Sequence, residues 1–196
     1  MKNFLLPLTL LISLSSASAF AGNDDVKVLK AKINQLEEKV AMYEAEKTLE
    51  AANVARYDKM DLVAFTNHDL DMIGDLHAAD VKVINPDGSL TSGWEHNHKA
   101  EMEWLFSTYS DVKITEHPIK FGSGDWTAGM SVIKGTWDTP MPLIDGRVLK
   151  PTGKAFSTHI VTLVRWEDGQ IAEEYLMWDN MDWYGQIGAL EAIIGK

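Results

Sequence analysis

Apolar side chains recur at helical spacing near the start of the chain. Steps of three and four separate Val26, Leu29, Ile33, Leu36, Val40 and Tyr43, as in the a/d seam of a coiled coil. Lys47 and Glu50 interrupt this seam, and no Pro or Gly occurs from Val26 to His68. The pattern predicts a helical stalk over residues 22–52 that continues into a globular domain. The seam is compatible with self-association of the stalk and equally with packing on its own domain.

Turn residues divide the remaining chain, residues 53–196, into helices followed by strands. Asp69 is the expected N-cap of a helix that ends near Ala79, and a third helix is expected over residues 95–109. A short strand, VKVIN, lies between them. Four strand-like runs follow at 112–121, 126–137, 154–166 and 170–179, and a last helix contains Trp183, Ile187, Leu190 and Ile194.

This order of elements predicts the fold class. Helices followed by hairpin-joined strands are typical of α+β proteins with a mostly antiparallel sheet. We expect a curved sheet wrapped by helices into a cone with an internal pocket, preceded by the N-terminal helical stalk. Such a pocket suits a small molecule.

The first 21 residues have the layout of a cleavable secretory signal. Lys2 precedes an apolar run from Phe4 to Leu14, and small residues follow. Cleavage is expected after Ala21, with Ala19 as the alternative. The predicted location is therefore periplasmic or secreted, with no membrane span after cleavage.

Charge and composition exclude several functions. The net charge of −11 argues against nucleic-acid partners, which require basic side chains. The absence of cysteine excludes disulfides, thiolate nucleophiles and cysteine-ligated zinc.

Four segments, in this order, resemble the SnoaL-like polyketide cyclases of the nuclear-transport-factor-2-like, or cystatin-like, superfold. They are NHDLDMIGDLHAADVKVINPDG, GWEHNHKAEMEWLF, the TGKAF…VTLVRWEDGQI hairpin and EEYLMWDNMDWYGQIG. The resemblance covers roughly residues 53 to 190. It implies the cone fold, a small-molecule ligand and aldol-type ring closure without metal or organic cofactor.

The resemblance also implies a catalytic acid/base at Asp179, because the family places an aspartate at the end of the last strand. Strand alternation groups Asp179 with Tyr175 and Met177, which are the expected substrate-binding neighbours. Burial against such side chains raises a carboxyl pKa toward the working range of a general base. The alternative is that Asp179 caps the terminal helix.

His159 is the second catalytic candidate, and its place depends on the Asp168-Gly169 turn. A two-residue loop pairs Thr158 with Asp179, whereas a three-residue loop with a glycine bulge pairs Ser157 with Asp179. Only the second arrangement puts His159 on the Asp179 face, where it can bond a substrate oxygen.

His96 and His98 form a His-x-His pair at the start of the third helix, near the expected pocket mouth. We expect them to contact substrate or to lie at a solvated helix end. A metal site needs a third ligand, and the spacing does not select His77, Asp80 or Glu101, so no metal is predicted.

Two functions remain open. The first is an exported, cofactor-independent cyclase, isomerase or lyase that acts through Asp179. The second is a non-catalytic periplasmic binding or assembly protein, which the stalk and the export signal favour. In either case we expect a homodimer through the outer sheet face, with Leu176 and Trp178 facing the partner.

Overall fold

A computed structural model describes residues 22–194 of the chain. Contacts divide the chain into two units, Met1–Ala45 and Glu46–Lys196. Residues 1–21, for which a signal peptide was predicted, lie outside the described residues. Within the part that is described, no helix is both long enough and apolar enough to cross a membrane.

Helix α1, Asn23–Asp58, is continuous, as the absence of Pro and Gly predicted. The seam side chains from Leu29 to Tyr43 are exposed in the single chain. In the second unit, Glu50, Asn53 and Tyr57 are the buried residues of this helix. These three residues attach its C-terminal turns to the globular fold.

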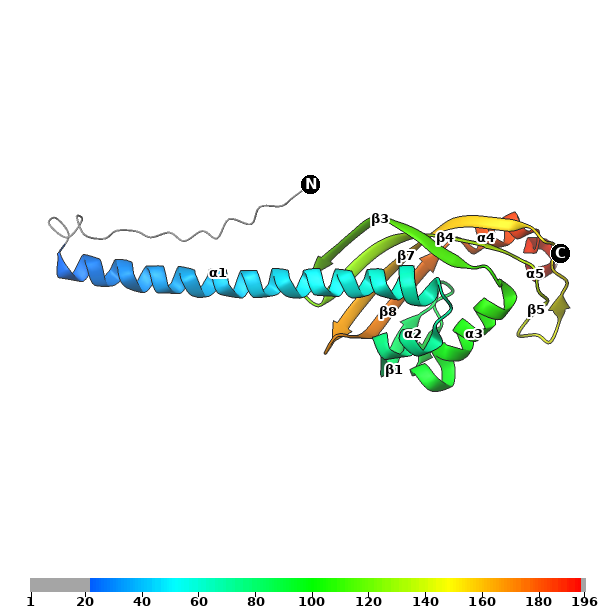
Figure 1. Cartoon of the computed structure of the whole chain (residues 1–196), viewed down its shortest axis with the longest axis horizontal. Coiled ribbons are helices and arrows are strands. Elements are labelled where there is room, and N and C mark those ends of the chain that lie inside the picture. The colour runs from blue at the N-terminus through cyan, green and yellow to red at the C-terminus, as the bar shows by residue number, and fades with distance from the viewer. Residues whose placement is uncertain (1–21, 195–196) are drawn as a thin grey trace. The chain divides into compact units, whose positions relative to one another are not determined.

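The other helical segments are short. They are η1 Lys59–Phe65, α2 Leu70–Leu76, η2 Trp94–His98, α3 Lys99–Thr108, α4 Asn180–Ile187 and α5 Leu190–Ile194. Both η1 and η2 are π-helical, with hydrogen bonds that span five residues, such as Thr66 N–H to the Asp61 carbonyl. Helices α2 and α3 lie next to each other against the sheet (Figure 1).

Two helix predictions need correction. Asp69 caps α2 as predicted, accepting a hydrogen bond from the Met72 N–H at 2.9 Å. The helix nevertheless ends at Leu76 instead of near Ala79, because His77 already pairs with Ile171 in the sheet. The predicted last helix is divided at Gly188, whose left-handed backbone (φ 74°) ends α4.

A curved sheet of six strands carries the fold, as predicted. Its strands are β1 His77–Ile84, β2 Leu90–Ser92, β3 Lys113–Ser123, β4 Trp126–Thr136, β7 Ala155–Glu167 and β8 Gln170–Trp178. Their order is β2-β1-β8-β7-β4-β3, and within the described residues β1 and β8 are the only parallel neighbours of this sheet. Strands β5 Met141–Pro142 and β6 Val148–Leu149 form a separate hairpin between β4 and β7.

The register of the β7–β8 hairpin decides which side chains face inward. Glu167 pairs with Gln170 across a two-residue turn, but a bulge at Ala172 then shifts the pairing, so Arg165 lies opposite Glu173. From there on, Glu174, Leu176 and Trp178 face inward. The prediction that Leu176 and Trp178 face a partner subunit is therefore wrong, because both line the internal cavity.

A glycine allows α1 to approach the sheet. The Tyr57 ring lies over Gly129 of β4, and its hydroxyl is 3.1 Å from Ser131 Oγ. A Cβ atom at Gly129 would come within 2.4 Å of the Tyr57 ring. Any side chain at position 129 would therefore displace the end of α1.

We expect Gly129→Ala to lower the free energy of unfolding by about 1–3 kcal/mol, as overpacking of a core does. Gly185→Ala is the control, because its Cβ meets no atom within 4 Å and lies in α4. Alanine is the better helix former, so this control should keep or raise stability. Urea unfolding of both variants measures the difference, and equal stabilities would contradict the packing argument.

Candidate functional site

The second unit encloses a cavity of about 70 Å³. Most of its wall is apolar, from side chains such as Phe65, Ile133, Leu176 and Trp183. Its polar lining residues are Asp61, His98, Thr162 and Glu174. Two carboxylates in such a wall are unusual, because a buried charge requires a partner.

The Asp61 carboxylate is held by two hydrogen bonds to the same oxygen. Its Oδ2 accepts from His117 Nε2 and from Ser131 Oγ, both at 2.9 Å. The other imidazole nitrogen of His117 donates to Asp58 Oδ1 at 2.8 Å. An ionised carboxylate only accepts hydrogen bonds, so when both Asp61 and Asp58 are ionised this geometry places protons on both nitrogens of His117. These residues, with Tyr57, form what we call the Asp61 network.

Burial and charge shift the pKa values in this network. Burial raises the pKa of Asp61, although the hydrogen bonds from His117 and Ser131 oppose this shift. Burial disfavours the charged His117, but its hydrogen bonds to Asp61 and Asp58 are stronger and raise its pKa. The pKa values of both hydrogen-bonded partners, Asp61 and His117, are therefore raised inside a water-poor site.

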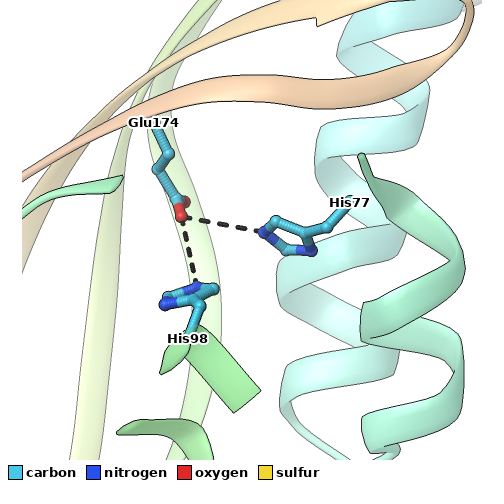
Figure 2. A group of neighbouring side chains, drawn as sticks. All are labelled: His77, His98 and Glu174. Carbon is cyan, nitrogen blue, oxygen red and sulfur yellow. Dashed lines mark ion pairs between the residues drawn. The ribbon is translucent and has the colours of Figure 1, made fainter. Parts of the chain in front are cut away.

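A second polar group contains His77, His98 and Glu174, which come from β1, η2 and β8 (Figure 2). The Glu174 Oε2 atom lies 3.8 Å from His77 Nε2 and 3.7 Å from His98 Nε2. Burial opposes ionisation of Glu174, but the two imidazoles lower its pKa. We call these residues the His77–His98–Glu174 cluster; their ligand atoms lie within 4.8 Å of one another, which makes them candidates to hold a metal.

Asp179 does not line this cavity. It is exposed, and it caps α4 by accepting hydrogen bonds from the Met181 and Asp182 N–H groups. His159 is also exposed, on the opposite sheet face from the cavity-lining Ile160. The structure thus places both sequence-predicted catalytic residues outside the cavity.

Tyr175 and Met177 share this outer face. Tyr175 is half-buried and Met177 is 45% exposed. The physical reason is the bulge at Ala172, which gives a register that differs from both alternatives considered for the hairpin. Tyr175 and Met177 alternate with Asp179 as predicted, but their common face is the outer one.

The His-x-His pair is divided between solvent and cavity. His98 is buried and lines the cavity, so it does not lie at a solvated helix end. His96 is exposed, two residues earlier in η2. The prediction did not include Asp61 or Glu174, although Glu174 shares a strand face with Leu176 and Trp178.

Residues 56–187 match the SnoaL-like polyketide cyclase family. The chain belongs to this family. No curated protein matches the sequence. The family match confirms the resemblance stated from the sequence, and it covers the elements that enclose the cavity of this SnoaL-like protein.

Solved structures show the same fold. A Jannaschia sp. CCS1 protein assigned as a SnoaL-like polyketide cyclase has 19% identity and a TM-score of 0.62, covering 72% of this chain and 94% of its own. AclR of Streptomyces galilaeus, assigned as a hydroxylase, has 20% identity and a TM-score of 0.59, covering 71% of this chain and 97% of its own. IdmH of Streptomyces antibioticus, assigned as a polyketide cyclase, has 22% identity and a TM-score of 0.57, covering 69% of this chain and 98% of its own.

The pKa shift of His117 predicts a pH dependence of stability. Its pKa is raised in the folded state, so its contribution is complete below the unfolded value of about 6.5 and is lost as the pH rises through the folded value. The free energy of unfolding should therefore decrease over this range. His117→Gln should remove this part of the dependence, whereas the exposed His159→Gln should retain it. Urea unfolding at a series of pH values tests this, and parallel curves for wild type and His117→Gln would contradict it.

Proposed function

We propose that this SnoaL-like protein binds a small, mostly apolar molecule with a carbonyl oxygen and transfers protons on it. Asp61 is the proposed acid/base, and no organic cofactor is required. The reaction class is a cyclisation, an isomerisation or a lyase reaction that begins with proton removal next to the carbonyl.

One observation carries this proposal: Asp61 is the carboxylate with a raised pKa in the wall of an apolar cavity. A carboxylate exposed to water is a weak base, whereas burial moves the pKa toward neutrality. Both hydrogen bonds that the Asp61 carboxylate accepts go to Oδ2, so neither occupies Oδ1. Oδ1 is the oxygen proposed to exchange a proton with the ligand.

A groove of about 540 Å³ provides the proposed entry route. It shares with the cavity the residues His98, Met102, Leu105, Leu176 and Trp178. The cavity is smaller than an engineered cavity of about 150 Å³ that holds one benzene, so a larger ligand requires these shared side chains to move. The unbranched Met102 is suited to such a rearrangement.

The second candidate function is ligand binding without catalysis. The small cavity volume favours it, because a ligand must first displace side chains before it reaches Asp61. Export is proposed for either function, on the layout of residues 1–21.

Asp61→Asn keeps the shape of the side chain and removes its ionisation. In D2O we expect wild type to exchange the α-protons of small enolisable ketones, such as cyclohexanone and acetophenone, as measured by NMR. The exchange rate should fall by about 10²–10⁴-fold in Asp61→Asn, which is the usual contribution of a general base. Asp179→Asn is the matched control and should keep the rate, because Asn is also a good N-cap.

Two outcomes would contradict the catalytic proposal. Loss of exchange in Asp179→Asn but not in Asp61→Asn would assign the chemistry to the α4 cap. If wild type shows no exchange but binds such ketones, with Asp61→Asn binding equally well, the non-catalytic function would be favoured. Circular dichroism of both variants establishes that they are folded.

We also propose that a homodimer forms through the outer sheet face, with residues other than those first predicted. Cross-strand pairs align Ile119, Met130, Val161 and Met177 in one row across four strands. Three of them, Ile119, Val161 and Met177, are 56%, 37% and 45% exposed. A continuous exposed apolar row of this kind is typical of an interface.

Replacement of Val161 by Lys places a charge at the centre of this row. We expect sedimentation velocity to show a dimer for wild type at tens of micromolar and a monomer for Val161→Lys, because an unpaired charge is disfavoured in an apolar interface. His159→Lys serves as the control for charge alone, because His159 lies two residues before Val161 on the same face of β7. A wild-type monomer at these concentrations would contradict the proposal.

A further inference from the structure

The His77–His98–Glu174 cluster is not used by the proposed proton transfer, and its geometry is unusual for a salt bridge. The Glu174 carboxylate lies 3.7–3.8 Å from both Nε2 atoms, which is too long for a hydrogen bond. His77 Nε2 is buried and has no hydrogen-bond partner among the described residues. All three side chains point toward one common position (Figure 2).

The hydrogen bonds on the far side of each ring determine the tautomers. His77 Nδ1 lies 2.7 Å from the Ile73 carbonyl oxygen, and His98 Nδ1 lies 2.9 Å from Glu101 Oε2. Both partners only accept hydrogen bonds, so both Nδ1 atoms carry a proton. In each neutral ring the lone pair is then on Nε2, the atom that faces Glu174.

When both rings are neutral, three electron-pair donors converge without a hydrogen atom between them. A metal ion at their centre would relieve this repulsion by accepting the three electron pairs. The two separations from Glu174 Oε2 exceed by only a few tenths of an ångström the roughly 3.4 Å that follows from metal–ligand bonds of about 2.0–2.2 Å in a tetrahedral site, and all three ligand atoms lie within 4.8 Å of one another. A small contraction would bring His77 and His98 to bonding distance.

The surroundings of the two histidines resemble those of metal-bound histidines. Metal-bound histidines usually donate their other N–H to a carbonyl or a carboxylate, which fixes the ring. Here Ile73 and Glu101 have these two roles, and Glu101 itself accepts a hydrogen bond from Thr91 Oγ1 at 2.5 Å. Trp94 stacks on the His77 ring at 5.2 Å between centroids and limits its rotation.

We propose that His77 Nε2, His98 Nε2 and Glu174 bind one divalent transition-metal ion, with Zn²⁺ and Fe²⁺ as the chemical candidates. Two imidazoles and one carboxylate form the ligand set of catalytic zinc sites and of non-haem iron sites. Imidazole ligands disfavour Mg²⁺ and Ca²⁺, which prefer oxygen.

Such an ion would also be accessible from the cavity, because His98 and Glu174 both line it. A coordination position that the protein leaves open can then take an oxygen atom of a bound ligand and polarise it. This inference extends beyond the proposed function, since metal binding does not depend on Asp61.

The test uses the full chain, treated with a chelator and then titrated with Zn²⁺ by calorimetry. We expect one ion per chain, retained through gel filtration and measured by elemental analysis. His77→Ala and Glu174→Gln should each weaken binding by more than about 100-fold, and Glu101→Gln by about 10–100-fold, the usual effect of losing a partner of a ligand. His96→Ala is the matched control, because this exposed histidine in the same turn should not contribute.

Two further measurements keep the inference testable if a ligand variant does not fold. The wild-type Co²⁺ derivative should show the absorption of a four- or five-coordinate site, and competition between Fe²⁺ and Zn²⁺ identifies the preferred ion. Asp61→Asn should bind Zn²⁺ as wild type does, which separates this inference from the proposed function. Absence of a retained ion in wild type, or equal losses in His96→Ala and His77→Ala, would overturn the assignment.

Discussion

The pairing of two buried carboxylates with imidazole side chains is the interaction on which this fold most depends. Asp61 and Glu174 are 6% and 5% exposed, and neither lies near an arginine or lysine among the described contacts. Leaving such a group buried without a partner costs several kcal/mol. Histidines meet this requirement from separate elements: His117 comes from the edge strand β3, and His77 and His98 come from β1 and η2. The Asp61–His117 and Glu174–His98 pairs therefore connect the helical layer to the sheet at two positions.

These two carboxylates differ in what their neighbours do to them. The Asp61 carboxyl is shifted toward its neutral form and Glu174 toward its ionised form, although both line the same small cavity. When two carboxyl groups have different environments, their pKa values differ. One fold can then provide a proton carrier and a fixed negative charge at the same time. The proposed base at Asp61 and the proposed ion at Glu174 follow from this difference.

The sequence was sufficient for the fold because its signals were local. The cap at Asp69, the Asp168-Gly169 hairpin and the alternation within each strand all appear in the structure. The site was not predictable in the same way, because it depends on a β-bulge of one residue in β8. Ala172 carries no mark of a bulge, yet the bulge there turns Glu174 inward and Asp179 outward. Asp61 lies within a helical stretch, KMDLVAF, whose local sequence does not indicate burial. Its partners His117 and Ser131 are distant in sequence and are brought to it only by the fold.

The π-helical turns have a consequence for how this chain can change in evolution. A π turn contains one more residue than the α turn that would replace it. Asp61 begins such a turn in η1, and His98 ends the one in η2. Removing a single residue from either segment would restore an ordinary α-helix and rotate the adjoining helix by about 100°, the angle per residue that follows from 3.6 residues per turn. One deletion could thus remove a polar group from the cavity while the rest of the cone is preserved, which gives this fold a short route between a polar interior and an inert one.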